Sequence, residues 1–232
     1  MKKTWCIGVM NAEFIARMEE ILWLYSLPYN RKRPVLCYDE RPCFLIGELV
    51  EGFSMKAGAV KKEHYAYSKN GSCSLLATIE PKTGKRVADV FGQRRKVEFA
   101  RHFQKVAAQF PEAEKIIVIL DNLNTHNASS FYEAFEAVEA RRLTEKFEFH
   151  YTPKSASWLN MIEIEFSAIS RLCLNRRIPS QAELEKEVLT IVKERSEKGV
   201  KIDWQFSIEK ARTKLNRHYE KVNSENIKYK ET

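Results

Sequence analysis

Two aspartates and one glutamate occupy positions from which carboxylates could act together. Asp39 closes the apolar run 35–38, Asp121 closes the strongly apolar run 115–120, and Glu163 lies in the first turns of a predicted helix. If the two runs form neighbouring strands, their aspartates meet at one end of a sheet, and the helix can bring the glutamate to them. The sequence therefore offers one candidate site made of three carboxylates.

Carboxylates gathered in this way need a compensating cation. At a separation of about 4 Å and an effective dielectric constant of about 20, each pair repels by roughly 4 kcal/mol. Mg2+ or Mn2+ offsets that repulsion, favours oxygen ligands and keeps waters that phosphate oxygens can replace. Two ions about 3.5 to 4 Å apart could activate an attacking oxygen and stabilise a leaving one. The chemistry expected is in-line displacement at a phosphodiester, without a covalent enzyme intermediate.

Each acid also has a structural interpretation. An aspartate that follows a strand commonly caps a turn or the next helix and has no catalytic role. Glu163 and Glu165 are two residues apart, so on a helix they face different directions and only one of them can point at the sheet. Spacing alone does not choose between the two glutamates.

Polar residues just after Asp121 form a second group of candidates. His126 could orient water or a phosphate, or could pack beside the start of a helix. Asn122 and Asn124 are expected to hold the strand-to-helix turn through side-chain bonds to the backbone. These residues would support the carboxylates from behind.

The elements that must position these residues follow from hydrophobic periodicity and breakers. Short apolar runs predict strands, and apolar residues at helical spacing predict helices. Expected strands cover residues 35–39, 44–46, 73–79, 86–91, 115–120 and 147–150, and expected helices cover 11–25, 97–110, 128–142, 181–197 and 207–219, with another beginning near 159. This order predicts an α/β fold, a mixed sheet of about five strands with helices on both faces. Such an order fits a ribonuclease-H-like fold.

Composition limits the class of protein. The 232 residues are 44% hydrophobic, enough for one principal domain, and the net charge of +8 with a pI near 9.2 suits a polyanionic partner. No apolar run reaches the length of a membrane span or a signal peptide core, so a cytoplasmic location is expected. The five cysteines form no CxxC pair, and no histidine combines with cysteine at zinc-ligand spacing. A metal would have oxygen ligands.

Candidate contacts to a nucleic acid are basic and aromatic. Trp158 could stack on a base, although its apolar bulk favours packing against the loop that carries Glu163. Exposed basic residues could neutralise phosphates or could form only a solvated face. The basic candidates are Lys154, Arg171, Arg176 and Arg177.

Three segments resemble known motifs. Residues 118–126 (VILDNLNTH) resemble the second-aspartate motif of mariner-like bacterial insertion-sequence transposases, and residues 151–163 (YTPKSASWLNMIE) resemble their third-acid motif. Residues 38–40 (YDE) match the first motif, and 204–206 (WQF) with 211–215 (ARTKL) look like the closing segment of that family. The chain is thus similar to the DDE endonuclease domain of these transposases from about residue 5 to residue 219.

This resemblance implies specific roles. Glu163, rather than Glu165, becomes the metal ligand beside Asp39 and Asp121, and the catalytic domain takes the ribonuclease-H-like fold. The family cleaves DNA at transposon ends and joins those ends to target DNA, with Mg2+ or Mn2+ and two ions expected. The supporting residues in these motifs are Glu40, Asn122, Asn124, His126, Trp158 and Asn160.

The same resemblance implies partners and a domain division. Double-stranded DNA is the expected partner, with a homodimer in the DNA complex and no membrane. Relatives carry helix-turn-helix modules ahead of the first aspartate, whereas 38 residues precede Asp39 here, so a separate polypeptide could supply recognition. The expected division is an N-terminal helix and linker at 1–32, a catalytic domain at 33–220 and a polar tail at 221–232.

Two departures from the family leave other functions open. Recognition modules are not evident, and Ser155 and Ala156 stand where relatives often have histidine and glycine. One alternative is a truncated protein that binds DNA or an intact transposase without cutting. Another is a ribonuclease-H-like nuclease of other purpose, which would cleave the RNA strand of a hybrid.

Overall fold

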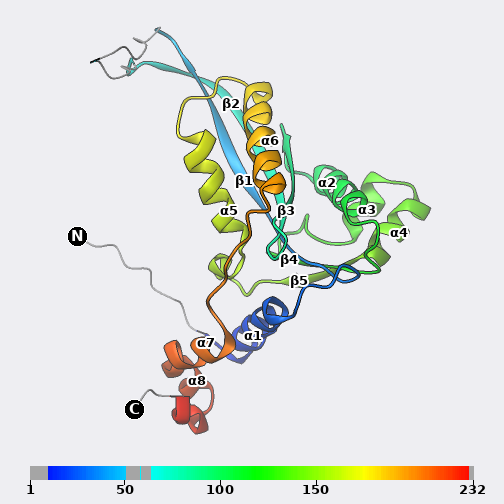
Figure 1. Ribbon diagram of the computed structural model, residues 1–232, viewed down its shortest axis with the longest axis vertical. Helices are drawn as coiled ribbons and strands as arrows, with labels where there is room; N and C mark the ends of the chain where they lie inside the picture. Colours follow the sequence, from blue (N-terminus) through cyan, green and yellow to red (C-terminus); the bar gives the residue numbers. More distant parts are fainter. Residues whose placement is uncertain (1–9, 51–57, 59–63, 230–232) are drawn as a thin grey trace.

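A five-stranded mixed sheet in the order β3-β2-β1-β4-β5 forms the centre of the molecule (Figure 1). The structure is a computed structural model that describes residues 10–50, 58 and 64–229. The glycine at 52 and the charged residues 61–63 predict a loop or irregular hairpin, and these positions lie outside the described residues. The ribonuclease-H-like mixed sheet expected from the order of elements is confirmed.

The strands pair in two modes. Strands β1 (Val35–Glu48), β2 (Tyr67–Glu80) and β3 (Lys85–Phe91) form an antiparallel meander. Strands β4 (Ile116–Leu120) and β5 (Phe147–Tyr151) add in parallel beside β1. Hairpin connections can join the antiparallel strands β1, β2 and β3, whereas the parallel strands β4 and β5 need crossover connections, which contain helices.

Strand β1 is longer than predicted. The sequence predicted two short strands at 35–39 and 44–46, but the structure has one continuous strand of 14 residues. Its pairing with β2 runs from Cys37 opposite Ile79 to Glu48 opposite Tyr67, with a shift in register after Leu45. The polar residues between the two predicted strands interrupt the apolar pattern without interrupting the ladder. In Figure 1 the far ends of β1 and β2 extend well beyond the rest of the sheet.

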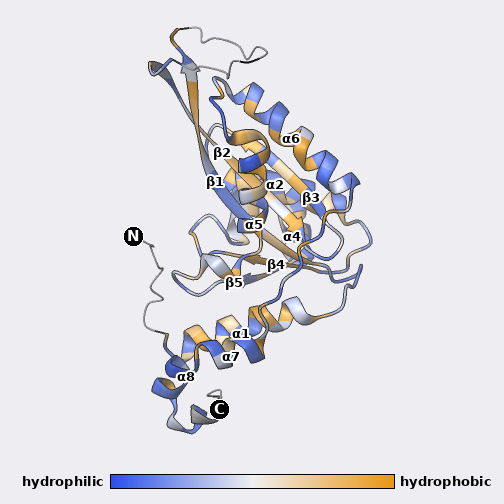
Figure 2. Ribbon diagram, turned by 60° about the vertical axis from the view of Figure 1, so that its left-hand side comes forward, coloured by the Kyte–Doolittle hydropathy of each residue, from blue (hydrophilic) through white to orange (hydrophobic). Residues whose placement is uncertain are grey.

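Helices cover both faces of the sheet, as predicted. Helices α2 (Lys96–Gln109), α3 (Ser129–Ala134) and α4 (Ala137–Lys146) lie over one face. Helices α5 (Ile162–Ile169) and α6 (Gln181–Glu197) lie over the other. Figure 2 shows that the strands between them are strongly hydrophobic, which matches the two buried clusters on opposite sides of the sheet.

Two predicted helices are broken in the structure. The helix expected over 128–142 is two helices, because Phe135 adopts an extended backbone (φ −134°, ψ 161°) and packs against the buried cluster beneath α2. The helix expected over 207–219 is likewise α7 (Ile208–Lys214) and α8 (Asn216–Val222), separated at Leu215. Asparagine and serine are favoured N-cap residues, and the side chains of Asn11, Ser180 and Ser207 each accept a bond from a backbone amide of the first turn.

The first helix packs with the last two. Helix α1 (Ala12–Ser26) buries Met18, Ile21 and Leu22 in the same cluster that contains residues of α5, α6, α7 and α8. Arg212 donates to both carboxylate oxygens of Glu19 at 2.8 Å, and the Tyr219 hydroxyl donates to Oε1 at 2.7 Å. In the described part of the chain, no helix is both long and apolar enough to cross a membrane.

A buried ion network joins α5 to β3 and to α6. Glu165 is 1% exposed, and its Oε2 accepts from Arg86 of β3 at 2.9 Å and from Arg195 of α6 at 2.9 Å. Arg195 also donates to Oε1 at 2.8 Å, and Arg86 donates to the Val200 carbonyl at 2.7 Å. Burial raises the pKa of Glu165, but the hydrogen bonds from Arg195 and Arg86 outweigh it and hold that pKa below the ordinary 4.5.

Replacing Glu165 by alanine should destabilise the fold at neutral pH, because two arginines lose a buried counter-charge. We expect a loss of about 3–5 kcal/mol in the free energy of unfolding, measured by urea denaturation. Since the folded-state pKa is lowered, the wild-type contribution is present above 4.5 and disappears as the pH falls below it. The variant should lack this component of acid sensitivity.

The matched control is Glu112→Ala, which breaks the exposed Arg31–Glu112 pair of 3.0 Å. It should cost no more than about 1 kcal/mol. Equal losses in the two variants would contradict a structural role for Glu165.

Candidate active site

The register between β1 and β4 places Asp39 beside Asp121. Cys37 pairs with Ile119 in parallel, so the same register two residues later sets Asp39 level with Asp121, which directly follows β4. Neighbouring strands are about 4.8 Å apart, and residues of equal parity share a face of the sheet. Asp121 follows its strand as predicted. Asp39 was predicted at the end of a strand, and this was wrong: it lies inside β1.

Asp39 is in an environment that disfavours its charge. Burial raises the pKa of its carboxyl to about 7; the amide of Glu40, which donates to Oδ1 at 2.7 Å, opposes this shift, and the negative charges of Asp121 and Glu163 add to it. The negative charges of the other two predicted acids therefore both reach Asp39. A divalent cation among them would reverse that penalty, and three carboxylates are the hard oxygen donors that Mg2+ and Mn2+ favour.

Glu163 and Glu165 have different surroundings although both belong to α5. The side chain of Glu163 is exposed, whereas Glu165 is buried and bound by Arg86 and Arg195. Glu163 is the glutamate whose charge reaches Asp39. The Glu163 amide donates to the Asn160 carbonyl at 3.2 Å, at the start of the helix.

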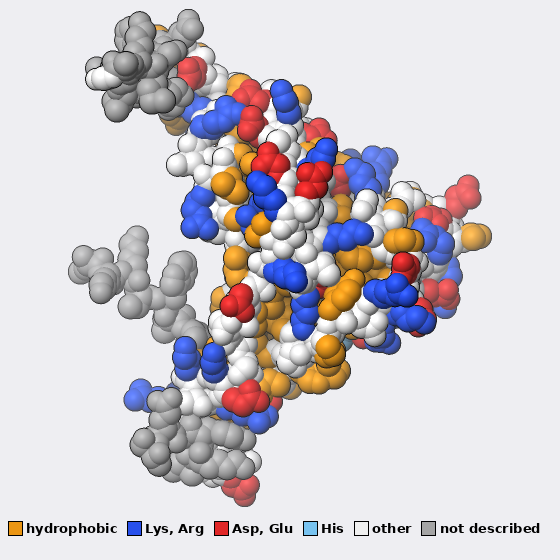
Figure 3. Space-filling view, in the orientation of Figure 1, with side chains coloured by type: hydrophobic (Ala, Val, Ile, Leu, Met, Phe, Trp, Pro, Cys, Tyr) orange, Lys and Arg blue, Asp and Glu red, His pale blue; other side chains and the backbone are white. Residues whose placement is uncertain are grey.

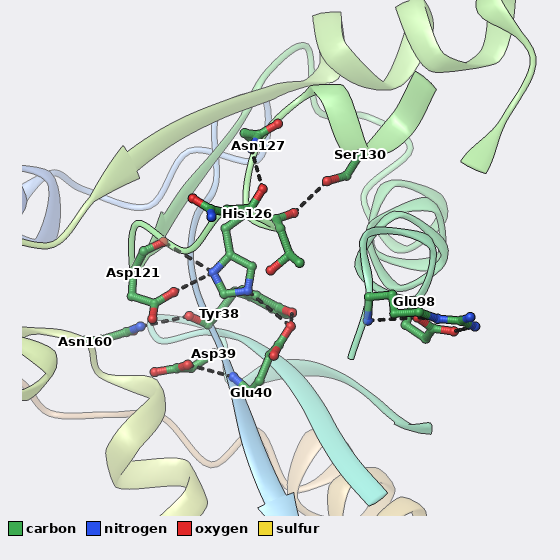
Figure 4. Close-up of polar contacts among 12 residues, drawn as sticks. Tyr38, Asp39, Glu40, Glu98, Asp121, His126, Asn127, Ser130 and Asn160 are labelled. Carbon is green, nitrogen blue, oxygen red and sulfur yellow. Dashed lines mark hydrogen bonds and ion pairs between the residues drawn. The ribbon is translucent and has the colours of Figure 1, made fainter. Parts of the chain in front are cut away.

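His126 bridges Asp121 and Glu40 (Figure 4). Its Nδ1 lies 2.5 Å from Asp121 Oδ1, and its Nε2 lies 3.1 Å from Glu40 Oε1. The ring is fully buried, and the Tyr38 hydroxyl also donates to Glu40 Oε1 at 3.1 Å. Because Asp39 and Glu40 are consecutive in a strand, their side chains lie on opposite faces, and His126 connects the site to the far side of the sheet.

Charge favours a protonated His126. Burial lowers its pKa, but the hydrogen bonds to Asp121 and Glu40 outweigh burial and raise it to about 9. Both ring nitrogens of an imidazolium donate, which suits a ring held between two carboxylates. Glu40 Oε2 is buried and has no hydrogen-bond partner among the described residues, so Oε1 alone carries the contacts of this carboxylate.

Asn160 attaches the third-acid segment to β1. The bond from Ile117 N to Pro34 O at 3.0 Å sets the phase of the ladder between β4 and β1, and two rungs later it would reach the Tyr38 carbonyl, beyond the end of β4. Asn160 Nδ2 donates to that carbonyl at 2.8 Å instead. The side chain of Asn160 thus replaces a strand partner and fixes the start of α5 beside Asp39.

The turn after β4 is held by a residue the sequence analysis missed. Asn127 donates from Nδ2 to the Asn124 carbonyl at 2.8 Å and accepts from the Ser129 amide at 2.9 Å. Its position just before the helix start is the signal that could have identified it. Asn122 and Asn124, predicted to hold this turn, have exposed side chains.

Trp158 lies in the loop before α5 and is 37% exposed. Its ring contacts Phe206 edge-on, with centroids 5.7 Å apart. This contact joins the third-acid motif to the closing segment of the chain. Trp158 therefore packs against another aromatic side chain of the protein, the role that its apolar bulk favoured.

The predicted basic residues lie in different settings. Arg176 pairs with Glu183 at 3.0 Å and with Glu187 at 2.9 Å, and Arg177 donates to the carbonyls of His64 and Ala66. Lys154 and Arg171 are exposed, and Lys154 lines a groove that ends at Asp121. Figure 3 shows basic and acidic side chains mixed over one face rather than gathered in one basic patch.

A second buried histidine lies behind the site. His102 Nδ1 is 2.8 Å from Asp89 Oδ2, and its Nε2 is 2.7 Å from Thr78 Oγ1. Although threonine, histidine and aspartate in this order are typical of nucleophile activation, Thr78 is 2% exposed and His102 is fully buried. No substrate reaches them, so the group braces α2 against β2 and β3.

No group of three histidine, cysteine, aspartate or glutamate side chains is drawn together closely enough to hold a metal ion within the described ranges. The fixed part of the site is Asp39 and Asp121, both set by strand register. Glu163 is exposed on α5, and its charge reaches Asp39. The donor set fits a divalent cation in its chemistry.

The chain is similar to known proteins in sequence pattern and fold. The family model described as DDE superfamily endonuclease matches residues 34–185, more than half of the chain. A Mos1 transposase paired-end complex with left transposon end has a TM-score of 0.55 at 14% identity, covering 100% of this chain and 67% of that one. A Mos1 mariner paired end complex with Mn has a TM-score of 0.55 at 14% identity, covering 100% and 68%.

The fold similarity extends to another state of that transposase. The Mos1 strand transfer complex has a TM-score of 0.53 at 13% identity and covers 97% of this chain and 65% of that chain. Comparison with curated proteins gives no match. At these identities the structural likeness concerns the fold, which is the ribonuclease-H-like arrangement already described.

Replacing Asn160 by alanine should loosen the link between α5 and β1. The Tyr38 carbonyl loses its partner in a buried position, which costs about 1–3 kcal/mol in the free energy of unfolding. Denaturation measures this loss. Asn70→Ala is the control, because Asn70 makes the same type of bond, to the Pro179 carbonyl at 2.9 Å, on the surface. An Asn160 variant as stable as the Asn70 variant would contradict the role assigned to this amide.

Replacing His126 by alanine should release Asp121 from its fixed orientation. Loss of a residue that orients a metal ligand typically lowers metal affinity by about 10- to 100-fold. Isothermal titration with Mn2+ measures this change directly. His150→Ala is the control, since His150 is bound between Glu20 and Glu148 rather than by any of the three acids. Unchanged Mn2+ affinity after loss of His126 would show that Asp121 does not need it.

Proposed function

Because the chain belongs to the DDE superfamily endonuclease family, we propose that it is the catalytic part of a transposase that cleaves and joins DNA phosphodiesters at transposon ends. The observation that carries this proposal is the juxtaposition of Asp39 in β1 with Asp121 directly after the neighbouring strand β4, with the charge of Glu163 acting on Asp39. The acids are those of the three motifs.

Asp39, Asp121 and Glu163 would hold Mg2+ or Mn2+, with two ions expected. Bound in this way, the cations supply Lewis-acid stabilisation of the attacking and leaving oxygens of an in-line displacement. The protein contributes fixed orientation: His126 holds Oδ1 of Asp121, and Asn160 sets the start of the helix that carries Glu163. No side chain needs to form a covalent bond to DNA.

The proposed substrate is double-stranded DNA, at transposon ends and at the target. Similar solved structures are transposase complexes with transposon ends, and the net charge of +8 supports a polyanionic partner. A homodimer in the DNA complex and a separate helix-turn-helix polypeptide belong to the same proposal. Assembly of the protein on DNA would reveal whether a homodimer forms and whether a second polypeptide is required.

Asp121→Asn should abolish metal-dependent cleavage while keeping the shape of the side chain. We expect Mn2+-dependent nicking of a supercoiled plasmid to fall by more than about 100-fold, beyond the loss typical of residues that only orient a ligand. Agarose gel electrophoresis measures the nicked form. Glu163→Gln should behave in the same way.

Asp203→Asn is the control, because Asp203 is exposed and its Oδ1 accepts from Gln205. Nicking that survives in Asp121→Asn at the wild-type rate would refute the proposal. Cleavage restricted to the RNA strand of a hybrid would instead identify a nuclease of the ribonuclease H type. DNA binding without cleavage would favour a binding protein.

A further inference from the structure

A groove of about 850 Å³ leads away from Asp121. Its walls come from three segments that are distant in sequence: the first half of α1, residues 121–123, and the loop 152–157. Asp121 of the proposed cutting site and the first half of α1 therefore line the same groove. The sequence predicted this helix as part of an N-terminal helix and linker at 1–32, ahead of the catalytic domain.

The loop wall presents a basic residue from a fixed support. The Thr152 amide donates to the Leu120 carbonyl at 2.9 Å, and the Ala156 amide donates to the Pro153 carbonyl at 3.1 Å. Thr152 and Ala156 are buried, whereas Lys154 and Ser155 between them are exposed. Among the described non-glycine residues, Ser155 alone has a positive φ, 62°, so the chain turns sharply here. Lys154 is thus held at the rim.

The helix wall presents a second basic residue. Arg17 is 40% exposed at its side chain and pairs with Glu13, 67% exposed, at 2.8 Å. An exposed pair of this kind contributes only about 0–1 kcal/mol, so the guanidinium can exchange Glu13 for a phosphate at little cost. Helix α1 is itself fixed in position, because Met18 and Ile21 are fully buried and Glu19 is bound by Arg212.

The surface between these walls is partly apolar. Leu123 is 42% exposed directly after Asn122, and Phe14 of α1 is half-buried at the same groove. A DNA strand offers matching chemistry, with charged phosphates along one side and flat apolar bases on the other. A small free anion would gain little here, because both cations are on exposed rims and an acid, Asp121, closes the end.

We propose that this groove holds the DNA strand that carries the scissile phosphate, with Lys154 and Arg17 contacting its backbone from opposite walls. The inference rests on the proposed function and adds to it a path for the strand and a residue of α1. Glu13 acts as a competitor that occupies Arg17 when no DNA is bound.

Salt dependence of DNA binding tests the proposal. Wild-type protein, Arg17→Ala and Lys154→Ala are titrated in EDTA with a short duplex of mixed sequence, at several salt concentrations. The binding constant K falls as salt rises. Each phosphate contact that is lost should make the plot of log K against log salt less steep, by about 0.9 for duplex and about 0.7 for single-stranded DNA. Glu13→Ala should bind more tightly, because it frees Arg17 and removes a negative charge.

Two basic residues outside the groove serve as controls. Arg31→Ala removes an arginine that is 72% exposed and paired with Glu112, and Lys193→Ala removes a lysine that is 77% exposed on α6. Both should keep the wild-type slope. Slopes that are unchanged in Arg17→Ala and Lys154→Ala, or lowered equally in the controls, would overturn the proposal.

Cleavage separates this inference from the proposed function. If Mn2+-dependent nicking requires Asp121 but the groove variants keep the wild-type slope, the function stands and the groove assignment fails. If the groove variants lose slope and wild-type protein does not nick DNA, the strand path stands and the cutting activity fails.

Discussion

The parallel contact between β1 and β4 is the constraint on which the rest of the site depends. It consists of three residue pairs, from Val35 with Ile117 to Cys37 with Ile119. Strand β4 ends at Leu120, so Asp121 leaves the sheet at the level of Asp39 while β1 continues beside β2. A slip of one residue in β1 would turn Asp39 to the opposite face and bring Glu40 in its place. Site geometry is therefore decided by a short stretch of backbone pairing.

That constraint also explains why the site has a front and a back. On the front, Asn160 donates to the Tyr38 carbonyl, which lies beyond the end of β4. This bond positions the helix that carries the third acid. On the back, Glu40 and the buried ring of His126 reach Asp121 from the other side of the sheet. Orientation of the carboxylates thus comes from both sides of the sheet. A change on either side can disturb the chemistry without touching an acid.

Sequence pattern predicted the parts of the site that depend on local order. Asp121 follows five uninterrupted apolar residues, which define the strand and its end without reference to the rest of the chain. Asp39 was placed at a strand end because residues 39–41 are polar, but its strand continues because β2 supplies partners far along the chain. Spacing alone could not choose between Glu163 and Glu165, because Glu165 is bound by Arg86, which lies 79 residues away in the sequence. Pairings at such separations leave no mark on periodicity.

The packing of α1 against the last helices has a consequence for how this protein can be inherited. The family pattern spans residues 34–185, yet Leu22 before it and Val188 and Tyr219 after it share one buried cluster with the helix of the third acid. A gene exchange that replaced only the matched stretch would join two halves of a core that had not evolved together. The piece that recombination can move intact is larger than the piece that the family pattern recognises.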